Sequence, residues 1–436
     1  MAQLNTTPRT PHRTHEGAPA LALGAHATLR RLVLTALLWE DQFYVDGVTI
    51  AQGIRDLVPR VAPELVAQLA VEAREGAKLR HVPLLLVREM ARHDTHRPLV
   101  TETLARVIQR PDELTEFLAL YWQDGRTPVA ASVKRGLAQA FGKFDEYALA
   151  KYNRDKTVKL RDVLRIAHPR PSSEAQADLW RRLSKGELAT PDTWETQLSA
   201  GADKRATWER LLQERKLGGL ALLRNLRGMH EAGVPDAAVR AGLRQMRTDR
   251  VLPYRFIAAA RHASHLEPEL EDAMLRSLTE LPRLAGHTVL LIDVSGSMSA
   301  PLSARSDLSR LDAAAGLAMM ARELCETCEV FTFSTILRQL PARRGFALRD
   351  AIGRPSGGTH LGAAVRHFQD RPHDRLIVLT DEESQDVVGA PRSGVQGYMI
   401  NVASTKRTVG FGPWTRLTGF SEQVLSWIQA QEVSDT

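Results

Sequence analysis

Apolar residues recur three and four positions apart in one short segment after another, from residue 25 to about residue 281. Leu29, Leu32 and Val33 show the spacing near the start, and Leu220 and Leu223 repeat it far downstream. Prolines and glycines interrupt the pattern roughly every 12 to 20 residues. The pattern predicts a succession of short helices, and the lack of a strict sequence repeat predicts an irregular HEAT-like array.

The pattern changes after residues 281–286. Residues 287–293 form a continuous apolar run, which is typical of a strand buried on both faces. Further strands are predicted at 329–333, 375–380 and 397–402, and helices at 311–326, 362–368 and 421–429. Such alternation predicts an α/β doubly wound, mostly parallel sheet. We therefore expect a flexible tail over 1–24, a helical domain over 25–284 and an α/β domain over 285–436.

Hydroxyl and carboxylate side chains gather where the predicted strands of the sheet end. Asp293, Ser295 and Ser297 directly follow the first strand, Asp381 follows the strand at 375–380, and Thr359 precedes a helix. Loops at the carboxyl ends of such strands form the binding crevice of the fold. Hard oxygen ligands favour Mg²⁺, with Mn²⁺ or Ca²⁺ as alternatives, and a serine-rich turn without metal is the competing interpretation.

The same five positions resemble the complete metal-ion-dependent adhesion site (MIDAS) of the von Willebrand A family. The resemblance implies that Asp293, Ser295, Ser297, Thr359 and Asp381 bind one cation, directly or through water. It also implies a coordination position open to a carboxylate from a partner.

Other chemistries fit this chain poorly. A haloacid-dehalogenase phosphatase needs an aspartate where Ser295 stands, and a nucleophile elbow needs glycines on both sides of that serine. Cys325 and Cys328 have zinc-like spacing, but no second ligand pair follows, so a structural role in the core is favoured. A metal-dependent hydrolase lacks an obvious general base. No catalytic residue is predicted, and we expect a binding protein that is not an enzyme.

Composition restricts the setting in which the protein works. Two cysteines in 436 residues give no disulfide framework, which favours the cytoplasm. No apolar run approaches the roughly 20 residues that cross a bilayer, so no membrane partner is expected. The first residues are polar and proline-rich and lack the apolar stretch of a signal peptide.

The net positive charge is confined to the helical part. The whole chain carries a net charge of +7, whereas residues 286–436 contain slightly more acidic than basic side chains. A basic excess restricted to one domain favours a polyanionic partner, most often a nucleic acid. Arginine-rich faces that are merely solvated remain an equal alternative.

The densest basic stretch spans residues 151–171. If residues 159–167 form a helix, Arg161, Arg165 and His168 follow one face, where they can contact successive phosphates, and Tyr152 can stack on an unpaired base. A second and weaker stripe follows at Arg240, Arg244 and Arg247. The candidate RNA-binding residues of the dense stretch are Lys151, Arg154, Lys156, Lys159, Arg161, Arg165, His168 and Arg170.

Four sequence blocks resemble the TROVE domain of the Ro ribonucleoproteins, in the family's order. Residues 151–171 are similar to its "KY…R…KDLLRLSHxKP" block, and residues 220–227 to its "ALLRNLR" block. Residues 251–257 resemble "HPxRI", and residues 38–44 are similar to its "GTYY" region. A von Willebrand A domain follows the TROVE domain in Ro proteins, as the metal motif follows these blocks here.

The resemblance implies a specific function. Ro-type proteins form a ring of helical repeats, so a ring or an arc is expected over 25–284. They bind small noncoding Y-like RNA on a basic outer surface, where Lys151, Arg161 and His168 fall. They also hold 3′ ends of misfolded RNA and work with a 3′ exoribonuclease in RNA processing and quality control. The alternative is a metal-dependent protein-interaction adaptor in which the A-type domain captures a partner carboxylate.

Overall fold

The computed structural model describes most of the chain between residues 24 and 403. The described residues are 12–13, 19–20, 24–35, 47–76, 79–199, 201–248, 251, 254–279, 281, 283–302, 308–403, 414–418, 424–425, 428–429 and 432. The similarity block at 38–44 lies outside them, as do most of the predicted tail and most of the predicted helix at 421–429. Two short strands, β1 (His12–Arg13) and β2 (Pro19–Ala20), pair antiparallel near the start.

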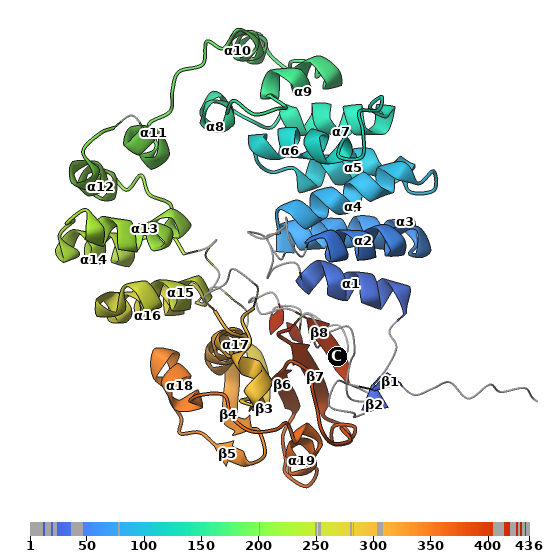
Figure 1. Cartoon of the computed structure of the whole chain (residues 1–436), viewed down its shortest axis with the longest axis vertical. Coiled ribbons are helices and arrows are strands. Elements are labelled where there is room, and N and C mark those ends of the chain that lie inside the picture. Colours follow the sequence, from blue (N-terminus) through green and yellow to red (C-terminus); the bar gives the residue numbers. More distant parts are fainter. Residues whose placement is uncertain are drawn as a thin grey trace, which may run out of the picture. The chain divides into compact units, whose positions relative to one another are not determined.

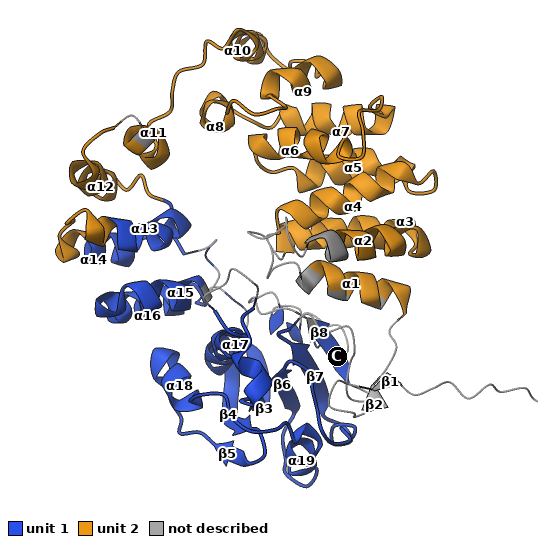
Figure 2. Ribbon diagram, in the orientation of Figure 1, with its two compact units in different colours: residues 1–23, 218–228, 239–436 blue, residues 24–217, 229–238 orange. Residues whose placement is uncertain are grey.

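The described residues form two compact units (Figure 2). One unit holds residues 24–217 and 229–238, and the other holds residues 1–23, 218–228 and 239–436. The chain therefore passes between the units more than once. Below, they are called the helical unit and the mixed unit.

The helical unit is built from short helices, as the apolar spacing predicts (Figure 1). In chain order they are α1 (Ala25–Thr35), α2 (Gly47–Leu57), η2 (Val58–Arg60), α3 (Pro63–Val71), η3 (Glu72–Gly76), α4 (His81–Arg92), α5 (Arg97–Val107), α6 (Pro111–Tyr121), α7 (Ala131–Phe141), α8 (Glu146–Tyr152), α9 (Leu160–Ala167), α10 (Glu174–Lys185), α11 (Trp194–Ser199) and α12 (Lys204–Gln213).

Local sequence explains where several of these helices begin. Pro63 and Pro111 stand at the first positions of α3 and α6, where a missing amide hydrogen costs nothing. Ser173 caps α10 by accepting a hydrogen bond from the Gln176 amide. Leucine, valine and phenylalanine side chains from α1 to α10 then pack into one continuous core. Prolines that interrupt the apolar pattern in the sequence thus stand at helix boundaries in the structure.

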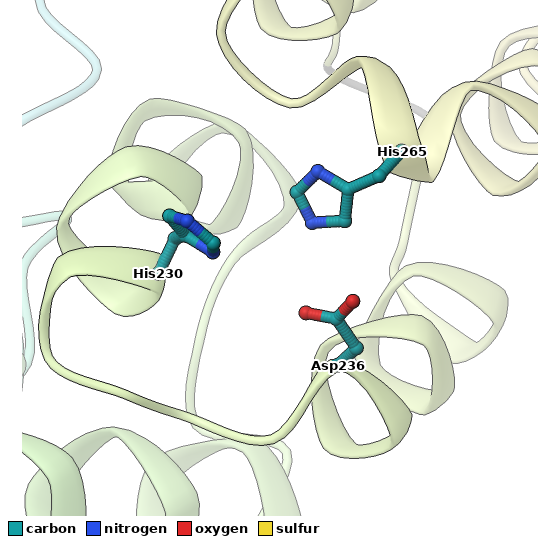
Figure 3. Close-up of side chains that lie close together, drawn as sticks. All are labelled: His230, Asp236 and His265. Carbon is teal, nitrogen blue, oxygen red and sulfur yellow. The ribbon is translucent and has the colours of Figure 1, made fainter.

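Four helices precede the sheet. They are α13 (Gly219–Glu231), α14 (Asp236–Gln245), α15 (Tyr254–His262) and α16 (Glu267–Arg276), with a single turn, η4 (Ser264–Leu266), before the last. Helices α13 and α14 each contribute residues to both units. His230, in the last turn of α13, and Asp236, at the start of α14, are exposed, and His265 lies in η4 (Figure 3).

The α/β part contains a six-stranded sheet with the order β5-β4-β3-β6-β7-β8. All neighbours are parallel except β5, which runs antiparallel to β4 at one edge. This confirms the predicted doubly wound fold. The strands are β3 (Leu284–Asp293), β4 (Cys325–Phe333), β5 (Leu337–Gln339), β6 (Arg375–Thr380), β7 (Gln396–Asn401) and β8 (Thr415–Thr418), and the helices are η5 (Gly296–Ser299), α17 (Arg310–Leu324), α18 (Gly345–Ile352) and α19 (Leu361–Arg366).

Both faces of the central strand β3 are covered. Val289 and Leu291 pack with Leu361 and Val365 of α19 on one face. The alternate residues of the strand point to the opposite face, and α17 contacts β3, β4 and β6. This burial on both sides explains the uninterrupted apolar run seen in the sequence.

Two adjoining predicted boundaries are wrong, the end of a helix and the start of the strand after it. The helix expected over 311–326 ends at Leu324, and Cys325 already begins β4. Cys325 pairs with Leu284 across the sheet, so the strand is longer than the predicted 329–333. Pairing with a distant strand overrides the local helical pattern there.

Candidate metal centre and nucleic-acid interface

The candidate metal residues lie at the switch point of the sheet, between β3 and β6, where the strand order changes direction. The chain runs from β3 to β4 on one side, and β6 lies on the other side of β3. Ile292 pairs with Leu379, so the ends of β3 and β6 lie next to each other. Such a switch point is the usual ligand-binding crevice of an open α/β sheet. Asp293 ends β3, and Asp381 directly follows β6.

The turn after β3 brings three of the predicted ligands together. Asp293 is fully buried, and its Oδ1 accepts a hydrogen bond of 2.8 Å from the Ser295 amide. The hydroxyl oxygens of Ser295 and Ser297 lie 3.2 Å apart. The Gly296 amide donates to the Gly357 carbonyl at 3.0 Å, which holds the turn against the loop that carries Thr359.

Close packing of two loops brings in the remaining two ligands. The backbone N–H of Gln385 donates to the Thr359 carbonyl at 2.9 Å, and the backbone N–H of Thr359 donates to the side-chain Oε1 of Gln385 at 3.3 Å. A β-carbon at Gly358 would lie 2.3 Å from Gln385 Oε1, so any larger residue there would displace the side chain that bonds the Thr359 amide. These bonds tie the Thr359 loop to the loop that begins with Asp381.

A second carboxylate in that loop was not anticipated from the sequence. Asp386 accepts hydrogen bonds from the amides of Gly362 and Ala363, both at 2.7 Å, and so caps α19. A β-carbon at Gly362 would lie 2.0 Å from the Val387 carbonyl oxygen, a backbone atom, so this position requires glycine. The spacing of Asp386 after Asp381 gives no local sign of this capping role.

The Asp293 carboxyl is perturbed by its surroundings. Burial and the nearby Asp381 carboxylate raise the pKa of Asp293 to about 7. Thr380 Oγ1 donates to Asp293 Oδ2 at 2.7 Å, and Arg310 Nη1 donates to Asp381 Oδ2 at 2.7 Å. Buried like charges favour a cation between them. Neither Thr380 nor Arg310 was identified from the sequence.

These residues fit a divalent cation. Two buried carboxylates and hydroxyls from Ser295 and Ser297 converge at the switch point, and Thr359 is fixed beside them. All the donors are oxygen, which hard cations such as Mg²⁺ prefer. The chemistry of these side chains therefore suits a hard divalent cation, and the metal site stays a prediction.

The cysteine pair lies away from this crevice, at the beginning of β4. Cys325 is buried, and Cys328 is partly buried; both are free thiols. Their position in the sheet is consistent with a role in the core.

The dense basic stretch belongs entirely to the helical unit. Lys151 is in α8, Arg161 and Arg165 are in α9, and the residues between occupy the connecting loop. Leu160, Val163 and Ala167 face the core, so α9 is amphipathic as predicted. The exposed members of the stretch are Arg154, Lys156, Arg161, Arg165, His168 and Arg170.

The acidic residues within this stretch are already engaged. Asp155 pairs with Lys159, and Asp162 accepts a hydrogen bond from the Lys159 amide at 2.9 Å, which caps α9. Lys156 pairs with Glu116 at 3.4 Å. Within the described part of the chain, Arg161 and Arg165 have no carboxylate within ion-pair distance. Their charge is therefore directed to solvent.

Two tyrosines flank Lys151 in α8. The Lys151 ammonium lies 6.0 Å from the centre of the Tyr147 ring and 5.8 Å from that of Tyr152. Tyr152 is half-buried, and the Arg110 guanidinium covers its ring at 4.8 Å. Tyr147 is 55% exposed and was missed in the sequence, because an isolated tyrosine in a helix has no distinctive pattern. It is the more accessible ring for stacking.

The second basic stripe is largely used within the mixed unit. Arg240 and Arg244 both pair with Glu269 of α16, at 2.5 and 3.2 Å. Arg240 also donates to the His265 carbonyl at 2.6 Å. Arg247 follows α14 and is exposed. The helical spacing of these arginines therefore serves, at least in part, to join α14 to α16.

The fold thus defines a helical protein that carries a von Willebrand A-like α/β domain. The model of the TROVE domain matches residues 35–186 and 181–306. The chain belongs to the TROVE-domain family, which is a family of RNA-binding ribonucleoprotein components.

Known proteins agree with this assignment. The Ro (RSR) protein of Deinococcus radiodurans has a similar structure, with a TM-score of 0.60 and 19% identity over 86% of this chain and 92% of that one. Telomerase protein component 1 from Rattus norvegicus is 21% identical over 300 residues, which cover 48% of this chain and 11% of that protein. The Mus musculus protein is 28% identical over 131 residues, or 29% of this chain and 5% of that protein. The chain thus spans only a small part of these two relatives. In the described part of the chain, no helix has the length and apolar character needed to span a bilayer.

Proposed function

We propose that this chain is an RNA-binding protein of Ro type that holds a small structured, Y-like noncoding RNA on the basic surface of α8 and α9. The observation that carries the proposal is the pair of exposed arginines at 161 and 165, set on a helix whose other face is buried. Cationic side chains one helical turn apart can contact successive phosphates. Family membership supplies independent support.

The interface combines charge with an aromatic surface. Tyr147, Lys151 and the arginines of α9 come from one short stretch of the helical unit. Phosphate contacts would supply most of the affinity, and an unpaired base would stack on Tyr147. This combination fits an RNA with both duplex and single-stranded parts better than a uniform double helix.

We propose further that Asp293, Ser295, Ser297, Thr359 and Asp381 hold one divalent cation, most favourably Mg²⁺ and alternatively Mn²⁺ or Ca²⁺. The ion would fix the loops after β3 and β6 and offer a coordination position to a partner. In this role the protein is a scaffold in cytoplasmic noncoding-RNA processing or quality control. A 3′ exoribonuclease and the 3′ ends of misfolded RNAs are the expected further partners.

The RNA proposal is tested by sequencing the RNA that co-purifies with the native protein. A dominant small structured species is expected with the wild-type protein, and it should be depleted from Arg161→Gln/Arg165→Gln. Arg205→Gln is the matched control, because Arg205 is an exposed helical arginine already paired with Glu209 at 2.7 Å. An RNA profile that does not differ between wild type and the double variant would refute this interface.

One observation favours the adaptor role as a second candidate. Ile336 is 76% exposed in the turn after β4, and Val387 is 57% exposed in the loop after β6. Both loops leave the carboxyl edge of the sheet, where the metal residues lie. Exposed apolar side chains beside a metal-bound carboxylate would suit a protein ligand. A proteinaceous partner retained only with divalent cations, and lost in Ile336→Ser/Val387→Ser, would support this second role.

A further inference from the structure

Arg310 places a positive charge inside the candidate metal centre. It is the first residue of α17, and its side chain is 25% exposed. Its Nη1 donates to Asp381 Oδ2 at 2.7 Å, while the Glu383 amide donates to Asp381 Oδ1 at 3.3 Å. Asp381 itself is fully buried. The guanidinium therefore occupies one oxygen of a carboxylate that the cation also needs.

The position of Arg310 in its helix is electrostatically unusual. The N-terminus of a helix carries a partial positive charge, which disfavours a cationic side chain in the first turn. Arg310 stands there nevertheless, and the Asp381 carboxylate compensates it. Arg310 therefore depends on its contact with Asp381, because the helix dipole disfavours its charge. The two residues are 71 positions apart in the sequence.

The backbone that carries Arg310 is firmly held. Ser309 caps α17, and Asp312 Oδ2 accepts hydrogen bonds from the Ser309 amide and hydroxyl, both at 2.6 Å. Arg261 of α15 donates to both Asp312 oxygens at 2.6 Å. Because these contacts fix the first turn, the Arg310 side chain can leave Asp381 by rotating about its own bonds, without moving the helix.

We propose that Arg310 is an internal counter-cation that competes with the divalent ion for Asp381 and so sets the affinity of the metal centre. The inference rests on the proposed metal site. A bound ion would draw on the Asp381 carboxylate, and the guanidinium would turn away from it. The negative charge of the two carboxylates would then be compensated in both states. Arg310 supplies one positive charge without the ion, and the ion supplies two when it is bound.

This exchange also gives the released arginine a role. A guanidinium at the edge of the centre has donors arranged for an anionic group. A partner carboxylate that reaches the ion would meet Arg310 beside it. Metal binding would thus expose the residue that helps to hold the partner.

The test is calorimetric titration of Mn²⁺ into the full-length protein. Removing a charge-assisted hydrogen bond that competes with the ion should tighten Mn²⁺ binding by about ten- to a hundredfold in Arg310→Gln. Arg310→Lys, which keeps the charge but loses the planar donors, should fall between that variant and wild type. Arg366→Gln is the control, because it removes an equal charge from a residue that pairs with Asp386 and not with Asp381; its affinity should stay within about twofold of wild type.

A melting experiment separates competition from a merely structural role. In EDTA, Arg310→Gln should melt at a lower temperature than wild type, because Asp381 loses its hydrogen bond from Arg310. In saturating Mn²⁺ that difference should vanish or reverse, whereas a structural arginine would give the same loss in both conditions. If Arg310→Gln does not fold without metal, Arg310→Lys carries the same comparison.

Each result decides one of the two proposals. If wild type binds Mn²⁺ and neither Arg310 variant binds it more tightly, the counter-cation role is overturned while the metal centre stands. An equal gain in Arg366→Gln would also overturn it, since the effect would then be general electrostatics. If neither the wild type nor any variant binds Mn²⁺, the proposed metal centre is refuted, and the role of Arg310 is refuted with it.

Discussion

The Thr380 hydroxyl donates a hydrogen bond of 2.7 Å to Asp293 Oδ2, so the last residue of β6 orients the carboxylate that ends β3. Parallel pairing of the two strands places these residues side by side, and Asp381 follows at once in the chain. The relative position of the two candidate acidic ligands is therefore set by the register of the central sheet. Loop conformation is secondary to it.

The first prediction concerns the separation of metal and RNA binding. Asp293→Ala should abolish measurable Mn²⁺ binding, because it removes a buried carboxylate ligand. RNA affinity should remain within about twofold, since the basic stretch belongs to the helical unit. Calorimetry and fluorescence anisotropy measure the two effects. Asp370→Ala removes an exposed carboxylate as a control, and a large loss of RNA binding in Asp293→Ala alone would contradict this separation.

The second prediction concerns salt. The logarithm of the RNA association constant should fall linearly with the logarithm of salt concentration, by roughly 0.7 to 0.9 per phosphate neutralised. Lys151→Ala/Arg161→Ala should weaken binding and reduce that slope by about one to two units. Titrations from low to near-physiological salt give the slope. Arg205→Ala, which loses an already paired charge, should leave it unchanged.

The third prediction concerns Tyr147. Loss of one stacked base costs about 1–3 kcal/mol, so Tyr147→Ala should weaken binding of RNA with single-stranded parts by roughly five- to a hundredfold. Tyr147→Phe keeps the ring and should bind almost as wild type does. Because no phosphate contact is removed, the salt slope should not change in either variant. A reduced slope in Tyr147→Ala would mean that the ring acts by positioning Lys151 instead.

The fourth prediction concerns acid stability. The hydrogen bond from Arg240 lowers the pKa of Glu269 below its ordinary value of 4.5. A depressed folded-state pKa stabilises the protein above the ordinary value, and that stabilisation is lost as pH falls through the depressed value. Arg240→Gln should therefore lower the free energy of unfolding at pH 7 and reduce its loss between about pH 5 and 3. Urea unfolding at several pH values gives the comparison, with Arg244→Gln expected to show a smaller effect because its contact with Glu269 is longer.

The sequence predicted those features that depend on local order. The apolar run ending at Asp293 required a strand covered on both faces, and the helix around Arg161 required one buried and one exposed side. Strand ends also located the metal residues, because parallel strands deliver their carboxyl ends to one edge of the sheet. In the strand and the helix the signal and the structure lie within a few neighbouring residues, and for the metal residues the parallel topology supplies the rest.

Features that depend on distant pairing could not be predicted. The contact of Arg310 with Asp381 spans 71 positions, and nothing in the sequence near Arg310 indicates it. The early start of β4 at Cys325 depends on pairing with Leu284, and the short edge strands β5 and β8 gain their structure from neighbours. Arg240 and Arg244 were predicted to belong to a second, weaker RNA-binding stripe, whereas Glu269 of a later helix pairs with both.

The contacts of α15 and α16 with the α/β part have a consequence for how this protein can be dissected. Arg261 of α15 reaches Asp312 of α17, and Arg349 of α18 pairs with Glu267 of α16 at 2.9 Å. A fragment cut at the sequence boundary near residue 285 would sever these links and expose the surface beneath them. Exchange of the α/β part between homologues should therefore succeed only when α15 and α16 are transferred with it. The exchanged segment must begin well before β3.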